Sequence, residues 1–211
     1  MLSPVSYARR AFGAVAEFEA ALCEYTGAPY AVAVDSCTNA LFLSLLYCAD
    51  YPAMTYPHGS SVTLPRKTYI GVAQAVLNAG YGLRWRDQDW EGMYALEPLP
   101  VADSARRFRR GMFLPLKVES NNWLMCLSFQ ATKHVPIGRG GAILTDNSTA
   151  ARWLRRARFD GREVDCEDTG QRGWHMYMTP PDAIRGLWLM QGLSARNEDL
   201  PSDHEDISGY T

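Results

Sequence analysis

The first fifty residues alternate between two hydrophobic patterns. Apolar residues recur every three to four positions, which predicts an amphipathic helix through Phe12, Val15, Phe18, Leu22 and Tyr25. Thr26-Gly27 follows, and a glycine just after the last apolar position is a typical helix stop. The continuous apolar run 30–34 predicts a buried strand, and the run 40–47 contains good helix formers. We therefore predict a helix, a strand and a second helix here.

The rest of the chain continues the alternation. Further strands are predicted over 61–65, 83–87, 99–103, 123–127 and 142–145. Further helices are predicted over 68–80, 147–159 and from 173 to about 193. From residue 197 the chain is acidic and poor in apolar residues, which predicts a flexible acidic tail at 197–211. We expect one domain over 1–196 with one substantial core.

Composition limits the partners and the compartment that we expect for the protein. A formal net charge of −2 gives no general attraction to nucleic acid or to a membrane, and no apolar run approaches a membrane span. Five cysteines without Cys-x-x-Cys spacing favour reduced thiols in a cytoplasmic protein. Two arginine clusters favour ion-paired or solvated faces, with a polyanion-binding surface as the alternative. The clusters are Arg106, Arg107, Arg109 and Arg110, and Arg152, Arg155, Arg156 and Arg158.

One lysine lies in a position of chemical interest. The chain has three lysines against eighteen arginines, and Lys133 lies in the loop 128–141 between two predicted strands. Arginine cannot form a Schiff base or lose its proton near neutral pH, whereas a partly buried lysine can do both. On these grounds alone, a solvated loop cation remains the commoner explanation.

The loop around Lys133 resembles a known cofactor-binding signature. Ser128-Phe129, Lys133 and Gly138-Arg139-Gly140-Gly141 are similar to the Ser-Phe-x-x-x-Lys-x-x-x-x-Gly-x-Gly-Gly signature of the DegT/DnrJ/StrS-type sugar aminotransferases. In that family the lysine carries pyridoxal 5′-phosphate (PLP). The resemblance implies this role for Lys133 and places Ser128 among the cofactor-binding residues.

A second motif lies at a predicted strand-to-helix turn, Ser36-Cys37-Thr38. A helix N-terminus has free backbone N–H groups and readily binds an anion, although an ordinary N-cap is the simpler explanation. The surrounding run is similar to the opening of the same family, where a Ser-Gly-Thr turn holds the cofactor phosphate. Cys37 replaces the glycine, so the backbone donors remain but a side chain crowds the phosphate approach.

Four more positions align with the family in order, two with the residue type of the family and two with a substitution. Tyr69 matches an aromatic residue that stacks on the pyridine ring, and Asp103 matches the aspartate that pairs with the ring nitrogen. Arg106 stands where the family has a glutamine near the phenolic oxygen of the ring. His175 occupies the place of an asparagine that reaches the phosphate of the partner subunit. Taken singly, Tyr69 fits core packing, Asp103 a strand-end cap and His175 a structural histidine.

The resemblance extends over residues 12 to 195 and implies a fold. That fold is α/β, a three-layer sandwich around a mostly parallel sheet, as in the large domain of fold-type-I PLP-dependent transferases. The stretch 87–103 is too short for the further strand and helix of the family, so we expect a deletion within the sheet. The small C-terminal domain of the family is not matched, which implies that a partner chain completes the site or that the substrate is too large to be enclosed.

The implied function is a PLP-dependent enzyme that acts at the Cα of an amine or amino acid, with Lys133 and Asp103 as its catalytic residues. The first expectation is an aminotransferase with a small-molecule amino donor. The second is a decarboxylase or other Cα-cleaving enzyme acting on a large substrate such as amino-acid-modified DNA, held by the arginine clusters. The third is a non-catalytic PLP-binding remnant. As in the family, we expect a homodimer with active sites at the subunit interface, and neither a metal nor a membrane partner.

Overall fold

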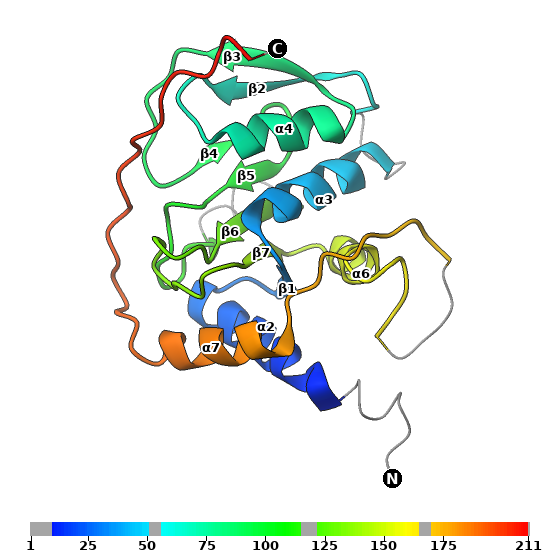
Figure 1. The fold of residues 1–211 in the computed structure, drawn as a ribbon, viewed down its shortest axis with the longest axis vertical. Coiled ribbons are helices and arrows are strands. Elements are labelled where there is room, and N and C mark those ends of the chain that lie inside the picture. The colour runs from blue at the N-terminus through cyan, green and yellow to red at the C-terminus, as the bar shows by residue number, and fades with distance from the viewer. Residues whose placement is uncertain (1–9, 51–55, 115–121, 165–169, 211) are drawn as a thin grey trace.

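The protein is an α/β structure built on a five-stranded sheet in the order β1-β7-β6-β5-β4 (Figure 1). It is a computed structural model that describes residues 10–50, 56–114, 122–164 and 170–210. The strands of this sheet are β1 (Tyr30–Val34), β7 (Gly141–Thr145), β6 (Leu124–Ser128), β5 (Val101–Asp103) and β4 (Tyr94–Ala95). A separate parallel pair contains β2 (Ser61–Pro65) and β3 (Gly82–Arg86).

The sheet is mixed, which corrects the expectation of a mostly parallel one while the α/β class is confirmed. β5 pairs with β6 in parallel, whereas the pairs β1–β7, β6–β7 and β4–β5 are antiparallel. The reason is the connection between β6 and β7. The lysine loop joins them without a crossover helix, so β7 returns beside β6 in the opposite direction.

The short stretch between β3 and β5 contains one strand, β4. Only the two residues of β4 pair there with β5, and they run against it. One antiparallel bridge joins the outer strand pair to this region, where the Thr63 N–H donates to the Glu97 carbonyl at 2.8 Å. A short antiparallel strand therefore occupies the stretch in which we expect a deletion relative to the family.

Two cores lie on opposite faces of the sheet because side chains alternate along each strand. On β1, Val32 and Val34 enter one core, whereas Ala31 and Ala33 enter the other. The first core packs against α3 (Cys37–Asp50), α4 (Ile70–Asn78) and α6 (Ser148–Ala157). The second packs against α2 (Gly13–Thr26) and α7 (Pro180–Met190). Figure 1 shows the resulting three layers, as expected from the resemblance.

The acidic segment 197–210, which we call the strap, is docked along one side of the molecule (Figure 1). This differs from the flexible tail that its composition predicts. Asp199 pairs with Arg107 and with Arg109, and Asp206 lies 2.7 Å from Arg66. Carboxylates that look solvated in the sequence thus meet arginines that tertiary folding brings to the same side.

The described cysteines, Cys23, Cys37, Cys48 and Cys126, are free thiols, as the odd number of cysteines predicts. Cys166 lies outside the described residues. Within the described ranges, we find no helix that combines the length and apolarity needed to cross a bilayer.

A buried ion pair connects the helices on the two faces of the sheet at its β1 edge. Glu19 of α2 is 6% exposed and accepts hydrogen bonds from the Ala33 N–H at 2.9 Å and from Arg158, which follows α6. Arg158 also donates to the Ala33 carbonyl, and Arg155 lies 3.5 Å from the other carboxylate oxygen. Loss of either partner would leave a buried charge without compensation.

We therefore expect Glu19→Ala to lower the free energy of unfolding by about 3–5 kcal/mol, measured by chemical denaturation. The matched control is Glu24→Ala, because Glu24 lies on the same helix with an exposed side chain. Equal unfolding midpoints for the two variants would show that the buried pair does not stabilise the fold.

Candidate active site

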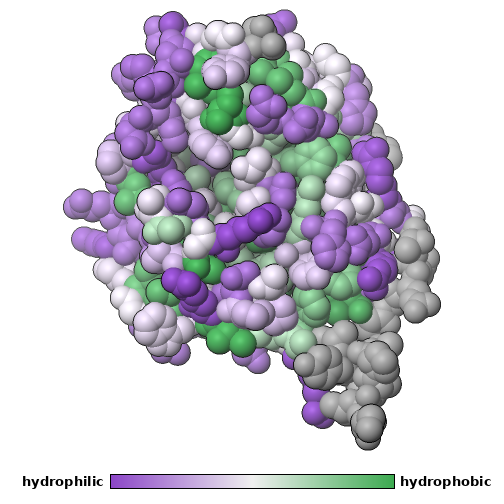
Figure 2. Space-filling view, viewed as in Figure 1, coloured by the Kyte–Doolittle hydropathy of each residue, from purple (hydrophilic) through white to green (hydrophobic). Residues whose placement is uncertain are grey.

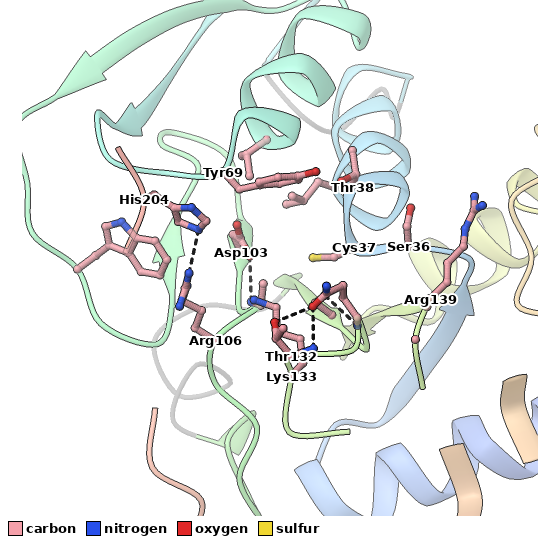
Figure 3. A pocket seen from close by; sticks show the side chains of 18 residues that line it. Ser36, Cys37, Thr38, Tyr69, Asp103, Arg106, Thr132, Lys133, Arg139 and His204 are labelled. Carbon is pink, nitrogen blue, oxygen red and sulfur yellow. Dashed lines mark hydrogen bonds between the residues drawn. The ribbon is translucent and has the colours of Figure 1, made fainter. Parts of the chain in front are cut away.

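The lysine loop, the N-terminus of α3 and the strap surround a cavity of about 360 Å³ (Figure 3). The structure brings to it eight of the residues singled out in the sequence: Ser36, Cys37, Thr38, Tyr69, Asp103, Arg106, Ser128 and Lys133. The exception is His175, whose Nδ1 lies 3.1 Å from Asp160 on the surface. His175 is therefore not part of the cavity within its own chain.

The turn before α3 has the geometry of a helix N-cap, and it leaves backbone N–H groups available to a ligand. The Ser36 hydroxyl accepts a hydrogen bond from the Asn39 N–H at 3.2 Å, so the N-cap interpretation is correct. Cys37 and Thr38 lie in the first turn of α3, where no earlier helical carbonyl can accept a hydrogen bond from their N–H groups. These N–H groups can therefore bind an anion. A Cβ atom on Gly141 would lie 2.5 Å from the Cys37 nitrogen, so the last glycine of the loop signature lets β7 approach this turn.

Tyr69 extends its ring across the cavity from Lys133 and Asp103 (Figure 3). The side chain is 54% exposed, so it is not the core residue that its sequence context favours. A Cβ atom on Gly71 would lie 2.5 Å from Cε1 of Tyr69 and 3.1 Å from Oγ1 of Thr38. Gly71 therefore gives the ring the room to fold back toward α3, leaving a flat aromatic face on the cavity.

Asp103 is a buried carboxylate at the end of β5 and is 5% exposed. It accepts hydrogen bonds from the Ala105 N–H at 2.9 Å and from the Tyr94 hydroxyl at 3.1 Å. Burial raises the pKa of Asp103, while these donors and the nearby Lys133 and Arg106 cations oppose the rise. A buried carboxylate with this surrounding can hold a positive group in the cavity.

Lys133 has an amine that loses its proton more easily than a free lysine. Burial lowers the pKa of Lys133, and the positive charge of Arg106 lowers it further, whereas the Asp103 carboxylate acts in the opposite direction. Burial also raises the pKa of the Cys37 thiol well above its usual range, which favours a neutral thiol beside the amine. The amine is thus suited to nucleophilic attack on a carbonyl group.

Some cavity residues were missed by sequence reasoning. Trp90 and His204 line the cavity, and Arg139 lies 2.8 Å from Asp35 beside the α3 turn. Tyr94, the hydrogen-bond donor to Asp103, belongs to β4, the short antiparallel strand between β3 and β5. Arg139 lies inside the loop signature, so its position near the cofactor site could have been predicted from the sequence. His204 could not, because it lies in a segment whose composition predicts flexibility.

The arginine clusters are largely engaged in contacts within the chain. In the first, Arg107 and Arg109 pair with Asp199, and the Arg110 guanidinium lies over the Tyr25 ring. In the second, Arg155 and Arg158 pair with Glu19. These contacts favour the ion-paired interpretation of the clusters over a polyanion-binding surface.

The position of Tyr69 can be tested through Gly71. We expect Gly71→Ala to displace the ring and to weaken PLP binding by about 0.5–1.5 kcal/mol, measured by spectroscopic titration. The control is Gly13→Ala, because a Cβ atom on Gly13 would meet nothing within 4 Å. If both variants bind PLP like the unmodified protein, Tyr69 does not contribute to the site.

Comparison with known proteins agrees with this architecture. The structure is similar to AtS13 from Actinomadura melliaura, with a TM-score of 0.66 and 21% identity over 91% of this chain and 66% of that one. It is also similar to the sugar aminotransferase CalS13 from Micromonospora echinospora, with a TM-score of 0.66 and 20% identity over 91% and 66% of the two chains. NtdA from Bacillus subtilis, solved with bound cofactor PMP, has a TM-score of 0.64 and 18% identity over 84% and 48%.

These likenesses show a shared fold, and the present chain spans less than two thirds of the length of each of these proteins. The family assignment comes from the sequence. Residues 10–99 and 118–198, which include the turn before α3, Tyr69, Lys133 and His175, match a single family. The chain belongs to the DegT/DnrJ/EryC1/StrS aminotransferase family.

Proposed function

We propose that the protein is a PLP-dependent aminotransferase that takes an amino group from a small-molecule donor and transfers it to a keto-sugar. The observation that carries the proposal is the meeting of Lys133, Asp103 and the Tyr69 ring around one cavity beside a helix N-terminus. Family membership supports the reaction class, and the likeness to CalS13, a sugar aminotransferase, supports the acceptor class.

The donor groups of the cavity fit PLP. Ser36, Thr38 and the N–H groups that begin α3 would hold the phosphate, with Arg139 as a nearby positive charge. Tyr69 would cover one face of the ring, and Asp103 would hold a proton on the ring nitrogen. Lys133 would carry the cofactor through a Schiff base. Gly71 and Gly141 keep this space open, because a methyl group on either would contact the site.

PLP, when bound, supplies an electron sink for the bond that breaks at the substrate Cα. The residues of the chain would manage the protons. Lys133 would take the Cα proton of the substrate, and its lowered pKa favours the neutral form that this role needs. Tyr94 keeps its own proton, because burial and then Asp103 raise the pKa of its hydroxyl well above its usual range. It therefore donates to Asp103 and orients that carboxylate.

Two substitutions separate holding the cofactor from using it. We expect Lys133→Ala to abolish the visible absorption of the PLP-loaded protein, while Lys67→Ala, at an exposed lysine, retains it.

Asp103→Asn should retain PLP but lose about 1.5–3 kcal/mol of charge-assisted hydrogen bonding, which lowers turnover roughly tenfold or more. The control is Asp87→Asn, at another strand end with an 84% exposed side chain. A protein that takes up no PLP, or an Asp103→Asn variant with unchanged turnover, contradicts the proposal.

We extend the proposal to assembly and location. Ile184 and Trp188 are 59% and 69% exposed and lie four residues apart on one face of α7, so they form an apolar pair that a homodimer contact would bury. His175 lies outside the cavity of its own chain, which agrees with an expected role toward a partner subunit. The free thiols agree with a reducing, cytoplasmic setting.

The dimer proposal predicts that Trp188→Glu yields monomers in analytical ultracentrifugation, because a charge would enter a buried apolar contact. The control is Leu77→Glu, which places the same charge at a 41% exposed position on α4, on the other face of the sheet. If Trp188→Glu remains a dimer, the interface lies on a surface other than this face of α7.

A further inference from the structure

The strap forms one side of the cavity. It runs from the end of α7 toward β2 and β3 along a mostly hydrophilic edge of the molecule (Figures 1 and 2). His204 lines the cavity, with its ring 6.4 Å from that of Trp90 and 6.1 Å from that of Tyr69. The Leu200 N–H donates to the Arg106 carbonyl at 2.8 Å, so the strap is anchored where it passes the cavity.

Arg106 is the residue of the cavity that holds the strap. Its Nη1 donates to the Pro201 carbonyl, and its Nη2 donates to one carboxylate oxygen of Asp203. Nη2 also lies 3.2 Å from Nε2 of His204. Burial and the nearby Arg106 cation lower the pKa of His204, which favours a neutral ring that accepts this bond. Each of these contacts comes from the strap.

The Arg106 guanidinium is incompletely paired. Its Nε is buried and has no hydrogen-bond partner among the described residues. Two other arginines that bind the strap show the complete arrangement. Arg107 uses Nε and Nη2 together and reaches both carboxylate oxygens of Asp199, and Arg66 places the same two nitrogens on one oxygen of Asp206, at 3.0 and 2.7 Å. The Nε–Nη2 edge of Arg106 thus has the form of a bidentate carboxylate site of which Asp203 fills one half.

The two partners of this contact differ in exposure. The Arg106 side chain is 11% exposed, whereas that of Asp203 is 83% exposed. A solvated carboxylate loses little free energy when another anion replaces it, because water solvates it again. A nearly buried guanidinium, by contrast, is destabilised unless an anion pairs with it. A carboxylate that reaches the cavity can therefore compete with Asp203, and it would gain the second donor, Nε, that Asp203 leaves unused.

We propose that Arg106 is a carboxylate-binding residue shared between the strap and the substrate. Asp203 occupies it when the strap is docked, and the carboxylate of an amino-acid donor displaces Asp203 and binds both nitrogens. This rests on the proposed aminotransferase function, because it assigns the donor carboxylate to that cavity. Binding of the donor and release of the strap near residues 201–204 are then linked.

The test uses glutarate, a dicarboxylate without an amino group, so that binding is measured without reaction. The full chain, loaded with PLP, is titrated calorimetrically as wild type and as Arg106→Gln, Asp203→Asn and Glu205→Gln. Glu205 is the matched control, because it is an exposed carboxylate of the strap for which the described residues show no ion pair. Hydrogen exchange of the strap amides is followed with and without glutarate.

We expect Asp203→Asn to bind glutarate about tenfold more tightly than wild type, Arg106→Gln to lose binding, and Glu205→Gln to match wild type. Amides of residues 201–204 should exchange faster when glutarate binds the wild-type protein. Unchanged affinity in Asp203→Asn, or retained binding in Arg106→Gln, would overturn the proposal. Equal binding of inorganic phosphate at Arg106 would also overturn it, by showing a general anion site.

PLP uptake, followed by absorbance in the same preparations, keeps the two proposals apart. Uptake of PLP without glutarate binding leaves the aminotransferase function standing and removes the role of Arg106. A wild-type protein without PLP uptake removes the proposed function, and glutarate titration of the same chain then decides whether Asp203 and an external carboxylate compete.

Discussion

The arrangement of the site depends on one buried charge, the Asp103 carboxylate. A carboxylate removed from water is costly unless donors and cations surround it. The main chain supplies one donor at Ala105, the reversed strand β4 supplies the Tyr94 hydroxyl, and Lys133 and Arg106 supply positive charge. Segments from separate parts of the sequence thus converge because each meets part of the same electrostatic requirement.

The compensation continues outward from the site. Arg106 balances Asp103 from inside the cavity, and its guanidinium then requires an anion, which the strap provides through Asp203. The same strap pairs Asp199 with Arg107 and Arg109, and Asp206 with Arg66. The abundance of arginine therefore has a structural use, since a planar guanidinium can bind a strap carboxylate through two nitrogens at once. It also explains why composition alone is a poor guide to the order of this segment.

The short region between β3 and β5 shapes the site as well as the sheet. A full parallel strand would place regular backbone pairing beside β5, whereas the short segment folds back as β4 and joins β2 at a single bridge. This reversal places Tyr94 next to Asp103 and Trp90 at the cavity. The short stretch between β3 and β5 thus contributes one hydrogen-bond donor to Asp103 and one residue to the cavity lining.

The sequence by itself predicted most of the helices and strands and the family signature, but not β4 or the start of α7 at Pro180 instead of residue 173. Apolar periodicity predicted α2, which ends before Gly27 with φ of 79°, and strands such as β1 and β2, because burial imposes its period locally. The resemblance pointed to Lys133, Asp103, Tyr69 and the turn before α3, which all line the cavity. Only the tertiary structure decided the direction of β7, the exposure of Tyr69, the surface position of His175 and the docking of the strap. These depend on pairings between residues far apart in the chain, such as Arg106 with Asp203, and local composition carries no information about which distant partner neutralises a charge.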